Sequence, residues 1–192
     1  MKFVSNKIIE IGRELSDLDL FTLDFIKILR KHTNYVIISG YVSILLGRAR
    51  ASEDIDIIIP KMDFPRFLLL LKDIRHGGFY CLNAEQNEDI YDQIKDNLAV
   101  RFAKEKTVIP NAELKFSKNK IDDITLDRKM TIKLQKDELV ISHLELQIAF
   151  KEVVLKSPKD MEDARHIRNV AEGHLDYKLI KKYERMLDDF YR

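Results

Sequence analysis

The run SEDIDIIIP places two aspartates inside a segment that is otherwise rich in isoleucine. The run is short and β-branched and it ends at a proline, which predicts a buried strand over residues 55–60. Side chains two positions apart on a strand face the same side, so Asp54 and Asp56 are expected to lie side by side. The isoleucines between and after them then point into the core. A strand of this kind needs surroundings that compensate the negative charge of its two adjacent carboxylates.

Two interpretations of this aspartate pair are open. Neighbouring carboxylates raise each other's pKa unless a counter-charge neutralises them, and a divalent cation does so directly. Oxygen ligands on a rigid strand suit Mg²⁺ or Mn²⁺, which proteins commonly hold through one or two carboxylates together with substrate phosphates. The alternative is an edge strand with a solvated acidic end, which requires no ligand.

The residues around the pair favour a phosphate-binding site. Gly40 lies between a predicted strand at 35–39 and a predicted short helix, where the missing side chain lets backbone N–H groups approach a ligand. Ser39 adds a hydroxyl at the same turn. Arg50 and Ser52 stand just before the aspartates, where they are expected to contact phosphate oxygens. An ordinary tight turn and a polar loop are the alternatives for these positions.

Taken together, these positions form a longer pattern of two glycines, an arginine, a serine and the Asp-Ile-Asp triplet at 54–56. The pattern resembles the signature of the DNA polymerase β-like nucleotidyltransferase superfamily, GG-x-A-L…G-x-x-R-x-[ST]-x-D-[IL]-D. The nearest form is similar to the minimal nucleotidyltransferases and the AbiEii-type toxins. This chain departs from it at the first glycine, where Ser39 stands. The resemblance covers most of the chain, densely at 36–59 and 142–167.

The resemblance implies a reaction and its cofactors. A nucleoside monophosphate would pass from a nucleoside triphosphate to a hydroxyl on RNA, a protein or a small molecule, with Mg²⁺ or Mn²⁺ bound at Asp54 and Asp56. Toxin-like relatives also imply a neutralising partner protein. A degenerate member that binds a nucleotide or a protein without turnover is an alternative, because the chain departs from the pattern.

A third metal-binding carboxylate is also implied, on a strand next to the aspartate pair. Glu113, in NAELKFS, is the candidate, with a glutamate where the family usually has an aspartate. It would help to ligate the metal and take the proton of the attacking hydroxyl. Asp122 and Asp123 come next in the chain, but they lie where a turn or helix start is expected, and we interpret them as solvated acids.

The C-terminal part resembles the toxin-like members through a lysine on one helix and a basic-Asp-x-x-Asp sequence on the next. Lys151 fits the first, with an implied phosphate or base contact, and Lys159, Asp160 and Asp163 fit the second. The alternatives are structural. Asp160 also stands where a helix-capping acid belongs, and Lys159 and Asp163 have the spacing of a surface ion pair.

Glu113-Leu114-Lys115 raises a rival hypothesis. An aspartate followed by E-x-K on strands is typical of metal-dependent nucleases, in which the lysine polarises the attacking water. The span from Asp56 to Glu113 is long for such a nuclease and includes two predicted helices. The features at Gly40, Arg50 and Ser52 would also go unexplained, so the nuclease is the second choice.

The rest of the chain predicts an α+β fold with a mixed sheet flanked by helices. Residues 1–141 would form the core, with helices at 6–14 and 17–31, and residues 142–192 a helical extension packed on it. Ser16 and Ser157 are predicted N-caps, and Ser142 begins a capping-box spacing. Helices are also expected at 62–76, 85–97 and 177–191, and further strands at 79–82, 98–103, 112–117, 129–134 and 138–142.

Composition excludes several classes of site. Net charge is +1, so overall charge does not indicate nucleic acid or an anionic membrane as a partner, although a local basic patch is compatible with it. The single Cys81 excludes an intrachain disulfide or a cysteine-built zinc site. The longest apolar run, at 67–71, is too short for a bilayer. We therefore expect a soluble cytoplasmic protein, with the apolar stripe of the last helix in the core or in a homodimer contact.

Overall fold

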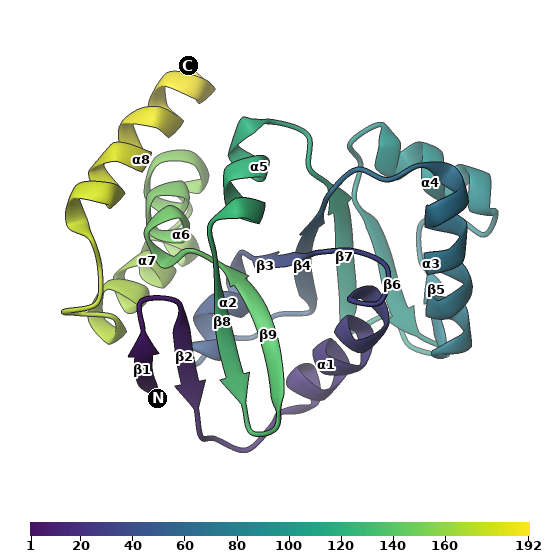
Figure 1. The fold of residues 1–192 in the computed structure, drawn as a ribbon, viewed down its shortest axis with the longest axis horizontal. Helices are drawn as coiled ribbons and strands as arrows, with labels where there is room; N and C mark the ends of the chain where they lie inside the picture. Colours follow the sequence, from purple (N-terminus) through teal and green to yellow (C-terminus); the bar gives the residue numbers. More distant parts are fainter.

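A nine-stranded mixed sheet organises the molecule, which a computed structural model describes over residues 1–192 (Figure 1). The spatial order of the strands is β1-β2-β8-β9-β3-β4-β7-β6-β5. The pairs β2–β8, β3–β9 and β4–β7 are parallel and the others antiparallel. The predicted α+β class is confirmed. The strands are β1 (Lys2–Ser5), β2 (Ile8–Ile11), β3 (Val36–Ile38), β4 (Asp54–Ile59), β5 (Phe79–Cys81), β6 (Val100–Lys104), β7 (Asn111–Phe116), β8 (Lys129–Leu134) and β9 (Asp137–Ser142).

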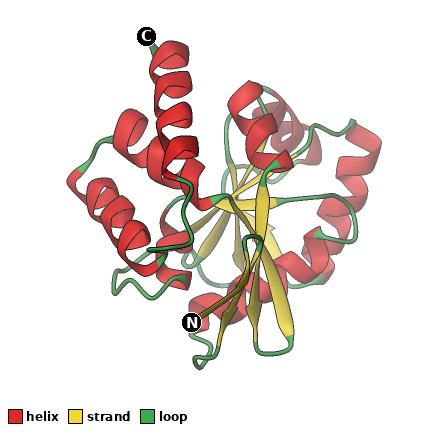
Figure 2. Ribbon diagram, turned by 60° about the vertical axis from the view of Figure 1, so that its left-hand side comes forward, coloured by secondary structure: helices red, strands yellow, loops and turns green.

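Helices gather in two groups, and Figure 2 shows the sheet between them. The first group, α1, α3 and α4, packs near β5, β6 and β7, and the second is the C-terminal set α6 to α8, at the left of Figure 1. The short helix α2 contacts β3, β4 and α7, and α5 contacts β4. The helices are α1 (Asp17–Leu29), α2 (Gly40–Leu45), α3 (Phe64–His76), α4 (Asn87–Lys95), α5 (Lys120–Asp127), α6 (Leu144–Phe150), the π-helical turn η1 (Lys151–Leu155), α7 (Pro158–Val170) and α8 (Tyr177–Tyr191).

Two of the three predicted caps are present. Ser16 caps α1 in a full capping box with Asp19, and the Ser157 side chain accepts from the backbone N–H of Asp160 at the start of α7. The capping box predicted at Ser142 is wrong. Strand β9 continues through Ser142, and α6 begins after His143 without a side-chain cap. The Ser142 hydroxyl instead accepts a hydrogen bond from the Gln147 amide.

The helix predicted at residues 6–14 is also wrong, because this segment belongs to a β-hairpin. Strand β2 pairs in parallel with β8, with Ile9 opposite Ile132. Along β2 the buried Ile9 and Ile11 alternate with the exposed Glu10, which is the period of a strand. The segment is too short to reveal its period from sequence, and pairing with the distant β8 decides its structure. Of the two predicted N-terminal helices, only α1 exists.

One continuous apolar cluster joins the sheet to both helix groups. It includes Ile55 and Ile57 from β4, Phe25 from α1, and Leu146 and Leu187 from the C-terminal helices. The helical extension therefore shares its core with the sheet. Its position beside the carboxyl half of β9 and the start of β4 places side chains of α6, η1 and α7 near the aspartate pair.

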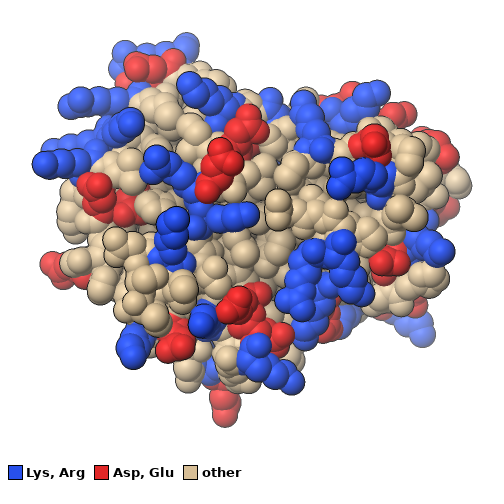
Figure 3. All heavy atoms as spheres, viewed as in Figure 1, with Lys and Arg blue, Asp and Glu red and all other residues tan.

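Charged side chains of both signs are interspersed on the face shown in Figure 3, in keeping with the net charge of +1. None of the helices is both long and apolar enough to cross a membrane.

Candidate functional site

The two aspartates lie on one face of β4, as the two-residue period of a strand predicts. Asp54 and Asp56 are half-buried, whereas Ile55 and Ile57, on the opposite face, are buried in the core. The Ser52 hydroxyl is 3.2 Å from an Asp54 carboxylate oxygen, to which it donates. The sequence of β4 thus fixes where the carboxylates point, because its isoleucines must face the core.

Glu113 is the direct neighbour of Asp56 on the parallel strand β7. Its carboxylate accepts a hydrogen bond from Arg101 Nε of β6 at 3.0 Å. Strand β6 lies on the side of β7 away from β4, so Glu113 is paired with a cation of the strand farther from the aspartates. The chain contains no group of three His, Cys, Asp or Glu side chains arranged to hold a metal ion. The sheet brings the three predicted acids onto neighbouring strands, and the ligand role of Glu113 stays a prediction.

The negative charge of Asp56 is only partly compensated by its neighbours. Burial raises the pKa of its carboxyl, Lys115 opposes that rise, and the nearby Glu113 adds to it. Lys115 Nζ lies 3.7 Å from Asp56 Oδ1, too far for a strong hydrogen bond, and the net direction remains upward. Two carboxylates with this deficit of positive charge fit a divalent cation, because a cation would favour the ionised form that burial disfavours.

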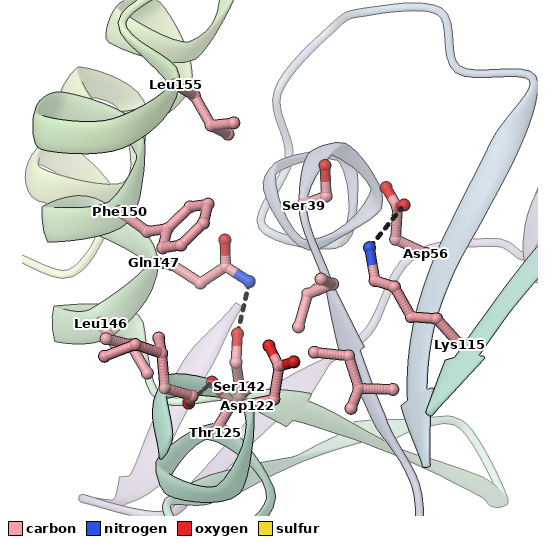
Figure 4. A pocket seen from close by; sticks show the side chains of 13 residues that line it. Ser39, Asp56, Lys115, Asp122, Thr125, Ser142, Leu146, Gln147, Phe150 and Leu155 are labelled. Carbon is pink, nitrogen blue, oxygen red and sulfur yellow. Dashed lines mark hydrogen bonds and ion pairs between the residues drawn. The ribbon is translucent and has the colours of Figure 1, made fainter. Parts of the chain in front are cut away.

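The turn between β3 and α2 has an unusual backbone. Ser39 has φ 66° and ψ −139°, in the left-handed half of the map that favours glycine, at the position where the family signature has its first glycine. The Ser39 hydroxyl faces Asp56, whose pKa it lowers (Figure 4). The serine therefore holds a polar group next to the carboxylate at the expense of backbone strain.

Gly40 makes room for Arg50. A Cβ atom at Gly40 would lie 2.8 Å from the Arg50 guanidinium nitrogens, so any side chain there would displace the arginine. The guanidinium packs on the first turn of α2 and reaches Asp163 from there. Burial lowers the pKa of Arg50, and so does the adjacent Arg48, while Asp160 and the aspartate pair raise it.

A buried carboxylate on α7 gathers three cations from distant parts of the chain. Asp163 is 0 % exposed and accepts hydrogen bonds from Arg50 Nη1 at 2.6 Å, from Lys151 Nζ at 2.8 Å and from Arg48 Nη1. Glu162, beside it, accepts from Arg48 at 2.5 Å. We call Arg48, Arg50, Lys151 and Asp163 the α7 charge cluster. It fastens the loop before β4 to the C-terminal helices.

Lys151 is the most enclosed cation of the cluster, at 1 % exposure. It lies at the start of η1, a kind of turn that is frequent at functional sites. Burial lowers its pKa, and Asp160, whose carboxylate is 3.3 Å from Nζ, opposes this. Asp160 also accepts from the Ser157 hydroxyl at 2.5 Å. It therefore takes part in the N-terminal cap of α7 and in the ion pairing of Lys151.

The surface ion pair considered for Lys159 and Asp163 is wrong. Asp163 is buried, while Lys159 is exposed and contributes only its backbone carbonyl, which accepts from Arg48. Arg48 was absent from the predicted site, and Asp163 was named only as the last residue of the basic-Asp-x-x-Asp sequence. One signal for Asp163 was available, since it lies one position before Ala164 and four before Ile167, both buried, on the inward face of α7.

A cavity of about 210 Å³ lies beside Asp56, between the sheet, α5 and the α6–η1 segment (Figure 4). Asp56, Ser39 and Lys115 are on one side, and Phe150 and Leu155 are on the other.

Asp122 also lines this cavity, from the first turn of α5. Asp122 and Asp123 both lie in the first turn of α5, where a turn or helix start was expected. Asp123 is exposed, as interpreted, and accepts from the Ser117 hydroxyl, whereas Asp122 is half-buried and accepts from the Lys118 backbone N–H. The cavity was not predicted from the sequence, because its walls come from seven separate elements, β3, β4, β7, β9, α5, α6 and η1.

No family model and no curated protein matches the chain. Solved structures do. An antigenic nucleotidyltransferase-like protein from Paracoccidioides brasiliensis is 16 % identical, and the match covers 92 % of this chain and 90 % of that chain with a TM-score of 0.54. The antibiotic-resistance factor ANT(2'')-Ia is 11 % identical over 92 % of this chain and 95 % of that chain, with a TM-score of 0.50. The predicted nucleotidyltransferase fold is confirmed, and the closeness to AbiEii-type toxins stays a prediction.

Proposed function

We propose that the protein transfers a nucleoside monophosphate from a nucleoside triphosphate to a hydroxyl acceptor, in a reaction that depends on Mg²⁺ or Mn²⁺. The observation that carries this proposal is the pairing of two groups of opposite charge within one nucleotidyltransferase-like fold. Burial lowers the pKa of Arg50 and of Lys151, while Asp54 and Asp56 oppose this at Arg50 and Asp56 opposes it at Lys151, so the acids and the cations are close enough to interact. A metal-bound polyphosphate suits such a site, with the metal at the acids and phosphate oxygens at the cations.

In this proposal each group has one task. Asp54 and Asp56 hold the metal, which when bound would neutralise charge on the triphosphate. Arg50 and Lys151 contact phosphate oxygens, and Asp163 holds these two cations in fixed positions. Ser39, Ser52 and the exposed Lys159 supply further donors, and Asp160 positions Lys151.

The transfer itself forms one bond and breaks one. The acceptor oxygen bonds to the α-phosphorus, the bond from that phosphorus to the oxygen bridging the β-phosphate breaks, and pyrophosphate leaves. The hydroxyl proton passes to a carboxylate of the site, for which Glu113 is the candidate. Most of the acceleration in such a reaction comes from positioning and charge neutralisation.

A second candidate function rests on the neighbours of Asp56. Glu113 is its partner across β7, and Lys115 lies 3.7 Å from it, so the D…E-x-K residues of a metal-dependent nuclease do meet on two adjacent strands. This candidate leaves the α7 charge cluster and Ser39 without a role. It predicts cleavage of DNA or RNA with no triphosphate present, and loss of that cleavage in Lys115→Ala.

The decisive experiment mixes the protein with each of the four nucleoside triphosphates and Mn²⁺, and measures triphosphate binding by calorimetry and pyrophosphate release by a coupled assay. We expect one or more of the triphosphates to bind and to release pyrophosphate when an acceptor extract is added. Binding without release in any extract would identify a degenerate member. Absence of binding, together with nucleic-acid cleavage that Lys115→Ala abolishes, would establish the nuclease instead.

A further inference from the structure

The cavity beside Asp56 and the α7 charge cluster have no residue in common. Of the predicted site residues, only Ser39 and Asp56 line the cavity. Arg50 and Lys151, the cations proposed to contact phosphate, do not line it, and neither does their partner Asp163. The cavity is therefore a separate compartment that shares one carboxylate with the proposed phosphate site.

The chemistry of transfer assigns different occupants to the two compartments. In displacement at phosphorus, the attacking and leaving oxygens lie roughly in line, on opposite sides of the phosphorus. If pyrophosphate leaves toward the cations Arg50 and Lys151, the acceptor must approach from the side opposite to them. The cavity at Asp56, between α5 and the α6–η1 segment, contains neither cation and is therefore the side that we assign to the acceptor.

The size of the cavity selects a small acceptor. Its volume of about 210 Å³ corresponds to roughly seven water molecules at about 30 Å³ each. This is room for one substituted ring and not for several nucleotides. The α6–η1 wall is apolar, with Leu146, Phe150 and Leu155, and the Gln147 amide lies among them.

The charge of the cavity selects against anions. Two carboxylates, Asp56 and Asp122, and one ammonium group, Lys115, line it, and the ammonium lies next to Asp56. No arginine is present, so a phosphodiester or carboxylate would enter without a counter-charge of its own. A neutral hydroxyl compound or one with a single positive charge meets no such penalty.

We propose that this cavity is the acceptor site, and that the acceptor is a small neutral or monocationic alcohol with an apolar body the size of one ring. The proposal rests on the proposed function and names its substrate class. The alcohol oxygen bonds to the α-phosphorus as the bond to the bridging oxygen breaks, pyrophosphate leaves, and the alcohol proton passes to a site carboxylate. The product is a nucleoside monophosphate ester of the alcohol.

Binding of three matched probes tests the site directly. Benzyl alcohol is neutral, 2-amino-2-phenylethanol carries an ammonium group and mandelate carries a carboxylate, and each has one ring and one hydroxyl. Saturation-transfer NMR should show the first two binding to the wild-type protein and mandelate binding at least ten-fold more weakly. Asp122→Asn should reduce the preference for the ammonium compound over mandelate, because it removes a carboxylate from the cavity.

A filling variant ties this binding to the cavity. Leu155 is 44 % exposed at the edge of the cavity and its side chain faces inward, so Leu155→Trp should reduce binding of benzyl alcohol at least ten-fold while the protein stays folded (Figure 4). Leu69→Trp is the matched control, since Leu69 is 59 % exposed on α3 and does not line the cavity. The control should bind the alcohol like the wild type.

Triphosphate binding distinguishes the possible outcomes. We expect Leu155→Trp to keep the triphosphate dissociation constant, measured with Mn²⁺, within about three-fold of wild type, since the phosphate site lies elsewhere. A much larger loss of triphosphate affinity would show that the cavity holds the nucleobase, and would overturn the proposal. Unchanged benzyl alcohol binding in Leu155→Trp, or no binding by the wild type, would also overturn it. If no triphosphate binds at all, the proposed function fails, whatever the probes do.

Discussion

The acids on β4 and the α7 charge cluster differ in how fully the charge of their central carboxylate is compensated. Asp56 lies beside Asp54 and Glu113 with one cation, Lys115 at 3.7 Å, and burial keeps its pKa raised. Asp163 lies among three cations that donate to it directly. A carboxylate that its partners satisfy stabilises the fold, whereas one that is only partly compensated is prepared for a ligand. The comparison assigns Asp163 to holding Arg50 and Lys151 in place and Asp56 to binding.

Replacing Asp163 should have the largest effect, and it should be an effect on stability. Asp163→Asn leaves buried Lys151 and two arginines without their shared counter-charge, which typically costs about 3–5 kcal/mol of unfolding free energy. Urea unfolding followed by circular dichroism measures this. Glu162→Gln is the matched control on the same helix. Because Glu162 is 56 % exposed, it should cost less than about 1 kcal/mol. Equal losses for the two variants would remove the distinction between the two charge groups.

Replacing Asp56 should lower the activity without lowering the stability. Asp56→Asn should lower the rate of pyrophosphate release about 10²- to 10³-fold, as is typical when one group that stabilises transition-state charge is removed. The unfolding free energy should stay equal or rise at pH 7, because burial raises the pKa of Asp56 above its ordinary value of 3.8 and so disfavours the ionised form in the fold. A raised carboxyl pKa contributes stability below 3.8 that is lost as the pH rises through the folded value.

The difference in stability between Asp56→Asn and the wild type should therefore shrink as the pH falls toward 3. Thermal unfolding without metal at pH 7 and pH 3 measures it. A variant that loses stability at pH 7, or that still releases pyrophosphate at the wild-type rate, would contradict the assignment of Asp56 as an unsatisfied ligand group.

Asp19 sharpens the comparison as a buried carboxylate that three hydrogen-bond donors satisfy. Burial acts to raise its pKa, but hydrogen bonds from Arg13, Tyr41 and Ser16 outweigh burial and lower the pKa to about 2. Its stabilising contribution is complete above the ordinary value of 3.8 and is lost as the pH falls from there through about 2. The expected loss is about 2 kcal/mol. The difference in unfolding free energy between wild type and Asp19→Asn, followed from pH 5 to pH 2, measures it, and a constant difference would refute it.

The smallest effect is expected at Arg101, which donates a hydrogen bond to Glu113. Its side chain is 54 % exposed, so Arg101→Gln should change the unfolding free energy by less than about 1 kcal/mol. If Glu113 is the third ligand, its release should tighten Mn²⁺ binding by up to about five-fold, the equivalent of about 1 kcal/mol. Calorimetric titration with Mn²⁺ compares the two proteins. Weaker Mn²⁺ binding in the variant would exclude Glu113 as a ligand.

The sequence predicted the features that depend on near neighbours. The strand at β4, the shared face of Asp54 and Asp56 and the Ser16 cap all follow from residues within a few positions of each other. The α7 charge cluster could not be predicted in the same way, because Arg48 and Arg50 meet Asp163 from 115 and 113 residues away. The helix predicted at 6–14 is wrong for the same reason, since the strand β2 pairs with the distant β8.

Ser39 has a further consequence for how this chain can change. A residue other than glycine in a sparsely populated backbone conformation costs of order 1–3 kcal/mol, and Ser39 has φ 66°. Variants selected only for heat resistance should therefore drift to glycine at this codon, which relaxes the peptide and discards the hydroxyl. Variants selected for turnover should keep serine, so a library sorted both ways would separate at a single position.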